Sequence, residues 1–278
     1  MTQQDAAPGS GTHDGGQGDG PVPALRVEGL SRHFGSLKAV EDVSFKVRPG
    51  SRHAVIGPNG AGKSTLFALT AGALRATAGR VWLHGDDVTS LTEHARARRG
   101  LVRTFQHSSL FLRATARENV LLAVQRRHGV QAQPWRAVTR RSALVREADE
   151  VLDRLLLSHR SGQLAGALSH GERRQLEVAV ALAAAPSVLL LDEPAAGMSP
   201  ADTHAFQEIV LGLPPELTVL LVEHDLDLVF GVADHVTVLH LGRHLLTGLP
   251  AEVRASDEVQ HAYLGAEDTS ALFFEEQE

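Results

Sequence analysis

The sequence predicts an α/β fold that combines a parallel-sheet core with an antiparallel β subdomain and an inserted α-helical subdomain. Two segments, 187–191 and 218–222, are continuously apolar, which is typical of strands buried on both faces of a parallel sheet. A glycine-rich loop at 57–65 stands between a short apolar strand and a helix. A block at about 107–168 has helical spacing and interrupts this α/β pattern, so we expect it to form the inserted subdomain.

The composition of the whole chain excludes several classes of protein. Its 278 residues are enough for one or two domains, and the net charge of −6 argues against broad nucleic-acid binding. The absence of cysteine excludes disulfides and thiolate metal sites. The longest apolar stretch, 178–191, contains Pro186 and is shorter than the ~20 residues of a membrane span. We expect no signal peptide, because the N-terminus lacks a basic region and an apolar run.

The chain opens with a tail and then a pair of strands. Residues 1–23 are rich in Gly, Asp, Gln and Pro without Lys or Arg, which predicts a disordered tail. Alternating apolar residues at 25–30 and 43–47 predict half-exposed strands. Phe34 is expected in the loop between them. Its ring could stack on a nucleotide base or belong to the core, and this segment favours neither interpretation.

The loop at 57–65 fits G-x-x-x-x-G-K-[ST], the Walker A pattern of a phosphate-binding loop. We predict a strand at 53–57 and a helix at 66–72 around it. Backbone N–H groups and the positive helix end would hold phosphate, Lys63 would reach the terminal phosphates, and the Ser64 hydroxyl would bind Mg²⁺. The predicted cradle consists of Gly57, Pro58, Asn59, Gly60, Ala61, Gly62, Lys63, Ser64 and Thr65.

A strand, a short helix and another strand follow the phosphate loop. The segment 80–84 predicts a strand and 101–105 another. Between them, the pattern 90–93 matches a capping box that would open a helix through Arg99. We expect the arginines of this helix to form a solvated face rather than a phosphate patch. They are Arg96, Arg98 and Arg99.

The inserted block is predicted to be mainly helical. A capping box at 115–118 would open a helix over 119–127, and a loop at 128–134 would lead to a second helix at 140–157. A third capping box, 169–172, precedes a helix predicted at 173–185. That helix end is either only well capped or a second phosphate-binding end, since it carries the Ser169 hydroxyl and the Gly171 backbone N–H.

Carboxylates and a histidine follow the two buried strands. Asp192 and Glu193 come at the end of strand 187–191, the edge where open α/β sheets bind ligands. Asp192 is the candidate Mg²⁺ ligand and Glu193 the candidate base that orients water. His224 follows strand 218–222 and is a candidate contact for the terminal phosphate.

Helix caps and a hairpin complete the predicted fold. Ser199 with Pro200 and Asp225 read as helix caps, and residues 235–246 predict a hairpin across Gly242. We expect an acidic tail at 267–278.

Several motifs occur together in one order along the chain. Residues 25–265 resemble the ATP-binding subunit of an ABC transporter, a P-loop NTPase with a RecA-like core. The resemblance implies one domain at about 24–266 and rests on the loop 57–65, Gln106, the segment 168–172, the segment 188–193 and His224.

The resemblance implies a role for each matching residue. Phe34 would stack on adenine, and Lys63 would hold the β- and γ-phosphates. Ser64 and Gln106 would serve Mg²⁺ and the attacking water, and Asp192 would hold Mg²⁺ through water.

The remaining implied roles concern catalysis and a second subunit. Glu193 would be the general base and His224 the γ-phosphate sensor. Ser169 and Gly171 would act on ATP bound by a second ATP-binding subunit in a head-to-tail dimer. His170, Glu172 and Ser199 depart from the usual residues of the signature and of the loop after the catalytic glutamate.

Some segments resemble one subfamily, the ATPases of branched-chain amino acid importers. They are 100–106, 118–123, 193–198, 222–225 and 262–265. Importers of urea and short amides share a histidine in the signature and remain an alternative. The resemblance implies membrane permease subunits that dock near Gln106 and 111–120 on the cytoplasmic face of the membrane, and indirectly an extracytoplasmic substrate-binding protein.

Two other functions remain open. One is a soluble ABC ATPase that acts on nucleic acid or ribosomes, although the chain lacks the tandem ATPase domains or long coiled coil usual there. The other is an exporter motor. We expect no nucleic-acid partner.

Overall fold

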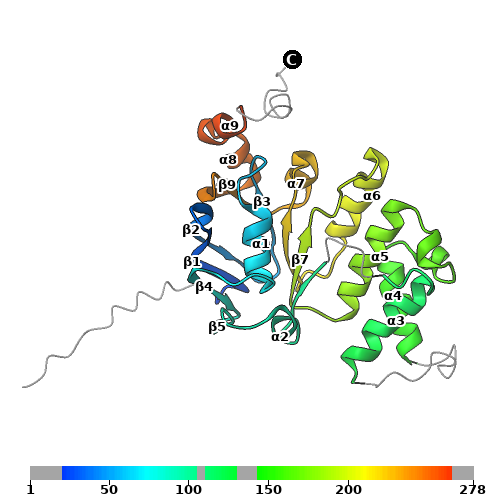
Figure 1. Ribbon diagram of the computed structural model, residues 1–278. Helices are drawn as coiled ribbons and strands as arrows, with labels where there is room; N and C mark the ends of the chain where they lie inside the picture. The colour runs from blue at the N-terminus through cyan, green and yellow to red at the C-terminus, as the bar shows by residue number, and fades with distance from the viewer. Residues whose placement is uncertain (1–20, 105–109, 130–142, 265–278) are drawn as a thin grey trace, which may run out of the picture.

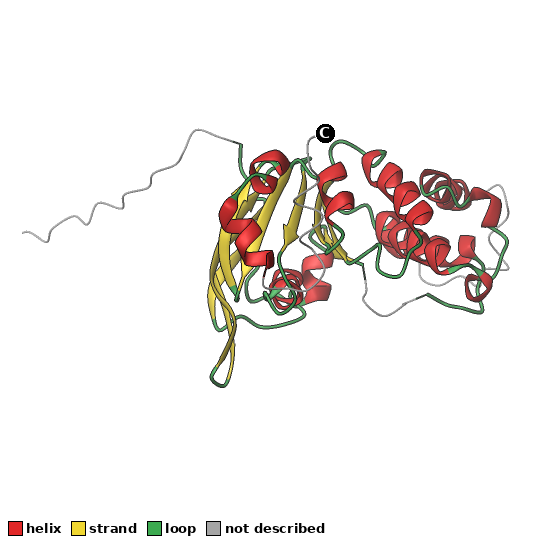
Figure 2. Cartoon of the chain, turned by 90° about the horizontal axis from the view of Figure 1, so that it is seen from above, coloured by secondary structure: helices red, strands yellow, loops and turns green. Residues whose placement is uncertain are grey.

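The computed structural model describes residues 21–104, 110–129 and 143–264. Two β-sheets lie side by side, and a layer of helices stands at one side of the larger sheet (Figures 1 and 2). Gln106, residues 1–20 of the predicted N-terminal tail and the predicted acidic tail at 267–278 lie outside the described residues, as do 107–109 and 130–142 of the predicted inserted block.

The smaller sheet is antiparallel, as predicted, with the order β2-β1-β4-β5. Its strands are β1 (Leu25–Phe34), β2 (Leu37–Val47), β4 (Ala78–Leu83) and β5 (Asp86–Asp87). The predicted loop at Phe34 was wrong, because β1 continues to Phe34, which pairs with Leu37 across a tight turn.

The larger sheet has the order β10-β9-β3-β8-β7-β6. Its strands pair in parallel except for β10, which pairs antiparallel with β9. They are β3 (Arg52–Ile56), β6 (Leu101–Arg103), β7 (Val188–Asp192), β8 (Thr218–Val222), β9 (His235–His240) and β10 (Arg243–Gly248). Every residue of β7 and β8 is buried, which confirms the prediction from their apolar runs.

Each face of the larger sheet has its own apolar core. Helix α1 (Lys63–Ala71) packs on one face, where Leu66 and Phe67 join a cluster with Val55 and with residues of the smaller sheet. The opposite face is covered by helices whose apolar residues form the second cluster. They are α6 (Pro200–Leu211), α7 (Leu226–Val232), α8 (Pro250–Arg254) and α9 (Asp257–Leu264).

The helical layer contains α3 (Ala116–Arg127), α4 (Ala143–Arg154) and α5 (His170–Ala183). Short 3₁₀ turns occupy Ser158–Arg160 and Ala165–Ala167. The capping boxes predicted at Thr115 and Ser169 are both present. Helix α5 begins earlier than predicted, at His170, because the Ser169 hydroxyl already caps it there.

The short helix α2 (Glu93–Ala97) differs from the prediction in two ways. Its cap is Thr92, whose hydroxyl accepts from the Ala95 N–H, and not Ser90. Arg96 is 2% exposed, so the predicted solvated face was wrong for this residue, whereas Arg98 and Arg99 are exposed. Arg96 is buried because its guanidinium donates to the carbonyls of Leu69 and Thr70 at the end of α1.

Two helices were not predicted, α8 and α9. Leu249, at the N-cap of α8, makes no side-chain cap hydrogen bond, so α8 lacks the usual polar signal at its start. The helix caps predicted at Ser199 and Asp225 are confirmed. None of the helices in the described part of the chain combines the length and apolar character needed to cross a membrane.

Candidate nucleotide-binding and catalytic site

The sheet register brings the candidate residues of three strands to one edge. Val55 of β3 pairs with Val222 of β8, and Val222 pairs with Asp192 of β7. The residues that follow these three, including Gly57 and Glu193, therefore emerge at the same carboxyl edge. This is the edge at which open α/β sheets bind ligands.

The phosphate loop needs glycine at two of its positions. A Cβ on Gly57 would lie 2.2 Å from the carbonyl oxygen of Leu239, and a Cβ on Gly62 would lie 2.4 Å from that of Ala39. Both also have positive φ, at 152° and 95°. The loop is thus fixed tightly against β9 and β2, while Asn59 and Gly60 remain exposed at its tip.

The first turn of α1 is free to receive an anion. Its N-cap, Gly62, makes no side-chain cap hydrogen bond, and the first turn contains no acidic residue. Ser64 in this turn is exposed, so its hydroxyl is accessible from the loop side. Helix N–H groups without an internal partner and the positive end of the dipole together favour phosphate.

Lys63 is buried beneath the loop and is held by its carbonyls. Its Nζ donates to the oxygen of Gly57 at 2.5 Å and to that of Pro58 at 3.1 Å. Burial lowers the pKa of Lys63, while the nearby Glu193 carboxylate raises it. The ammonium is therefore held at the loop carbonyls, close enough to Glu193 for the two charges to interact.

Asp192 ends β7 and is 3% exposed. Its Oδ2 accepts from the Arg103 guanidinium at 2.5 Å, whereas Oδ1 is buried and has no hydrogen-bond partner among the described residues. A buried carboxylate oxygen without a partner is costly unless a cation or its water supplies one. No cluster of three or more metal-ligating side chains occurs in the described residues.

Glu193 adopts an uncommon backbone conformation for a residue with a side chain. Its φ is +44°, and its N–H donates to the carbonyl of Val222 at 2.9 Å. The side chain is partly exposed at the carboxyl edge. Backbone strain of this kind is common where a side chain must be directed toward a reacting group.

Glu223 is a residue of the site that the sequence reasoning missed. It is fully buried, and its two oxygens accept from the N–H groups of Ala195 at 2.8 Å and His224 at 3.0 Å. Burial raises the pKa of Glu223, and these backbone donors oppose the rise. The carboxylate thus ties the loop after Glu193 to the loop that carries His224. Its position directly after a buried, mainly apolar strand was a usable signal, as it was for Asp192.

His224 projects from the carboxyl end of β8. Its side chain is 61% exposed, and Nδ1 lies 3.6 Å from Glu223 Oε2. Arg103, which the sequence reasoning also left without a role, pairs with Asp192 from the neighbouring strand β6.

Phe34 is 46% exposed at the end of β1, so the core alternative for this ring is wrong. The Arg32 guanidinium lies 4.5 Å from the ring centroid, which gives a cation–π contact. Phe34 pairs with Leu37 of β2 at the turn of the hairpin. Ala39, two residues further along β2, lies against the phosphate loop at Gly62.

Ser169 and Gly171 lie elsewhere, at the N-terminus of α5 in the helical layer (Figure 1). Within the described residues, no hydrogen bond joins either of them to the phosphate loop. The neighbouring His170 contacts the carbonyl oxygen of Ala196 at 3.0 Å through Nε2. The α5 terminus therefore touches the loop after Glu193, while Ser169 stays exposed.

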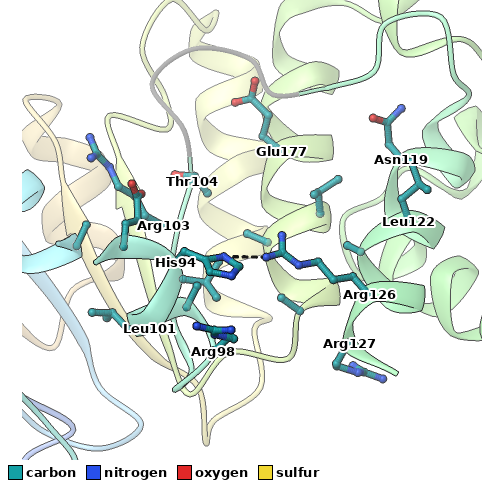
Figure 3. Close-up of a pocket in the computed structure, with 18 of the residues that line it drawn as sticks. His94, Arg98, Leu101, Arg103, Thr104, Asn119, Leu122, Arg126, Arg127 and Glu177 are labelled. Carbon is teal, nitrogen blue, oxygen red and sulfur yellow. Dashed lines mark hydrogen bonds between the residues drawn. The ribbon is translucent and has the colours of Figure 1, made fainter. Parts of the chain in front are cut away.

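A groove of about 670 Å³ lies between α2 and β6 on one side and α3 and α5 on the other. Figure 3 shows side chains of α2, β6, α3 and α5 around it, with His94 and Arg126 joined by a hydrogen bond of 3.0 Å. Phe111 and Asn119, from the segment expected to receive a permease, are among its lining residues. Its cations are Arg98, Arg103, Arg126 and Arg127, against Glu93 and Glu177.

Comparison with curated proteins gives close relatives over nearly the whole chain. BraF of Pseudomonas aeruginosa, a high-affinity branched-chain amino acid transport ATP-binding protein, is 39% identical over 252 residues, which are 87% of this chain and 98% of BraF. LptB of Haemophilus influenzae, a lipopolysaccharide export system ATP-binding protein, is 35% identical over 87% of this chain and 97% of LptB.

Among solved structures, the ADP conformation of MJ1267, an ATP-binding cassette of an ABC transporter, matches with a TM-score of 0.77 and 32% identity. The match covers 87% of this chain and 99% of MJ1267. The family model described as ABC transporter matches residues 40–196, a range that includes the phosphate loop, α5 and the carboxyl end of β7. The chain therefore belongs to the ATP-binding proteins of the ABC transporter family.

Proposed function

We propose that the chain is the ATP-hydrolysing motor subunit of a membrane importer for branched-chain amino acids. The observation that carries this proposal is the convergence of the phosphate loop, Asp192 and Glu193 at one sheet edge. The identity with BraF over almost all of both chains supports the cargo class.

The phosphate loop would bind the triphosphate of ATP. Backbone N–H groups of residues 57–65 and the N-terminus of α1 would hold the phosphate oxygens. Lys63 would exchange the carbonyls of Gly57 and Pro58 for the β- and γ-phosphates. The exposed ring of Phe34 would stack on the adenine.

The residues around Ser64 and Asp192 fit a Mg²⁺ ion. The Ser64 hydroxyl is accessible at the loop, and Asp192 Oδ1 is a buried acceptor without a described partner. Gln106, which lies outside the described residues, is proposed as a further ligand. When bound, Mg²⁺ would neutralise part of the negative charge of the phosphates.

Hydrolysis would depend on Glu193 and His224. Glu193 would accept a proton from the attacking water and orient it in line with the terminal phosphate bond. His224 would contact the γ-phosphate from the end of β8, and Gln106 would help to position the water. Glu223 would keep the two loops in a fixed relation through its bonds to Ala195 and His224.

A second ATP-binding subunit would complete the site. Ser169 and the Gly171 N–H, at the capped end of α5, do not bond to the chain's own phosphate loop within the described residues. We therefore assign them to ATP bound by a partner cassette in a head-to-tail dimer. ATP binding would close this dimer and hydrolysis would open it.

The groove between sheet and helical layer would receive a segment of the membrane permease. Arg103 and Arg127 of its lining are already paired with Asp192 and Glu147, so the permease segment would meet a mixed polar and apolar lining. The chain would then lie on the cytoplasmic face of the membrane, and an extracytoplasmic binding protein would act on the far side of the permease.

LptB is almost as similar to this chain as BraF is, yet its name gives lipopolysaccharide export instead of amino acid transport. The cargo is therefore best tested in the assembled complex. Affinity purification of the tagged chain from membranes should recover permease subunits, and branched-chain amino acids with their binding protein should stimulate its ATPase activity more than urea does. Recovery of ribosomes or nucleic acid without any permease would contradict the proposal.

A further inference from the structure

Strand β6 ends beside the carboxylate that is proposed to hold Mg²⁺. Its last residue, Arg103, pairs with Leu190 of β7. Thr104 extends this pairing by one residue, since its N–H donates to the Leu190 carbonyl at 2.9 Å. The Thr104 hydroxyl accepts from the Asp192 N–H at 3.4 Å. The end of β6 is therefore tied to the backbone of Asp192.

A buried ion pair joins the side chains at the ends of the same two strands. Arg103 Nη2 donates to Asp192 Oδ2 at 2.5 Å, and the two side chains are 12% and 0% exposed. Arg103 makes no other ion pair within the described residues, and its Nε has no hydrogen-bond partner there. Removing one member of a buried ion pair leaves the other charge uncompensated, so each of these residues depends on the other.

Helix α1 contacts the same guanidinium from another direction. The Arg103 Cζ lies 5.6 Å from the centroid of the Phe67 ring, which is 1% exposed. Phe67 belongs to the helix that begins at the phosphate loop, so Arg103 lies between that helix and the end of β7. The cation–π contact restricts the guanidinium to a position next to Asp192.

The pairing leaves the two oxygens of Asp192 in different states. Oδ2 is bonded to Arg103, whereas Oδ1 is buried and has no partner within the described residues. A carboxylate that is held at one oxygen cannot turn freely, so its other oxygen keeps one direction. Carboxylates that ligate metal ions are commonly oriented by such a hydrogen-bonded partner.

We infer that Arg103 is a positioning residue of the Mg²⁺ site, which fixes Asp192 through Oδ2 and keeps Oδ1 for the ion or for a water bound to it. The inference rests on the proposed function, in which Asp192 holds Mg²⁺ beside ATP. Arg103 and Thr104 also line the groove shown in Figure 3. A permease segment in that groove would therefore meet two residues that bond to the proposed metal ligand.

The expected effect of losing the guanidinium is on metal affinity. Arg103→Met keeps an apolar stem beside Phe67 but removes the cation, so Asp192 Oδ2 must find another donor and the carboxylate turns. Metal affinity should fall by about tenfold or more, the usual cost of losing the partner of a metal ligand.

The test uses the full chain with a non-hydrolysable ATP analogue and Mn²⁺ in place of Mg²⁺. Electron paramagnetic resonance measures the Mn²⁺ bound by the wild type, by Arg103→Met and by Arg98→Met. Arg98 is an exposed cation of the same groove, so its variant is the matched control and should bind Mn²⁺ like the wild type. Equal affinities in all three proteins, equal losses in both variants, or tighter binding in Arg103→Met would overturn the inference.

Arg103→Lys tests the geometry of the pairing. It restores the positive charge without the planar guanidinium, so it should recover only part of the lost affinity. If Arg103→Met does not fold, Arg103→Lys decides the question alone. Its Mn²⁺ affinity should then lie below that of the wild type, and an affinity equal to the wild type would overturn the inference.

The wild-type chain separates this inference from the proposed function. If it binds no more Mn²⁺ than the free ATP analogue does, the metal site itself is overturned. Clear Mn²⁺ binding by the wild type with no loss in Arg103→Met would overturn the role of Arg103 alone.

Discussion

Glu223 shows how one buried carboxylate can organise a site without touching the substrate. Its oxygens accept from Ala195 and His224, which belong to the loops after β7 and β8. Glu223→Gln keeps the shape of the side chain but turns one acceptor into a donor. One of the two N–H groups must then face an NH₂ group, and the loop that carries it should shift.

We predict that Glu223→Gln lowers kcat by about tenfold or more, the cost of one unsatisfied buried group. ATP affinity should not change, because the phosphate loop does not contact Glu223 in the hydrogen bonds of the described residues. Steady-state ATPase assays and nucleotide titrations measure the two effects. The exposed Glu208→Gln is the control, and equal kcat values for the two variants would contradict the role.

Among the secondary-structure elements, α2 is joined to α1 by the side chain of Arg96. Its guanidinium donates to the carbonyls of Leu69 and Thr70 at the end of α1, and to Leu91 and Thr89. Burial lowers the pKa of Arg96 to about 10, so it remains charged at neutral pH. A cation at the C-terminus of a helix also interacts favourably with the helix dipole.

Arg96→Met should destabilise the chain by about 3 kcal/mol or more, because it keeps the apolar stem but leaves several buried carbonyls without donors. Arg98→Met, two residues away on the exposed face, should change stability by less than about 0.5 kcal/mol. Urea denaturation of both variants measures this difference. Similar unfolding midpoints for the two would show that the buried carbonyls do not need Arg96.

Strand β3 carries a buried titratable side chain, His53. Its Nε2 contacts Thr237 Oγ1 at 2.8 Å, and its ring stacks on His235 with the centroids 6.3 Å apart. Burial, with the charge of His235 as a smaller cause, lowers the pKa of His53 to about 3. Below its unfolded pKa of about 6.5, the unfolded chain therefore binds a proton that the folded chain does not.

Stability should fall as the pH drops from about 6.5 toward 3, with a slope of about 1.4 kcal/mol per pH unit from this group. His53→Gln should flatten that slope above pH ~5.5, where carboxylates are still almost fully ionised. The exposed His159→Gln should keep it. Urea denaturation across this pH range provides the measurement, and identical slopes in the two variants would contradict the buried state of His53.

For the molecule as a whole, the sequence predicted those elements that depend on residues close together in the chain. The phosphate loop, the two apolar strands and four of the polar helix caps follow from short-range spacing, and the structure confirms those elements. Asp192 and Glu193 could be placed at the sheet edge because they end an apolar strand. The roles assigned to them remain predictions.

The remaining features depend on contacts between segments that are distant in sequence. Arg96 looks like part of a charged surface until the end of α1 is placed beside it. Val253 and Val259 join the apolar cluster of the larger sheet only after α8 and α9 pack against it. Arg103 likewise gains its partner from the register of β6 beside β7. No local pattern in one sequence carries this information.

The central claim is that the edge formed by β3, β7 and β8 binds ATP and hydrolyses it with Glu193 as base. The most direct test measures ATP binding and turnover together in the purified membrane complex that carries Glu193→Gln. We predict that turnover falls by at least about a hundredfold, the usual contribution of a general base, while ATP affinity stays close to that of the wild type. Hydrolysis near the wild-type rate by this variant would contradict the claim.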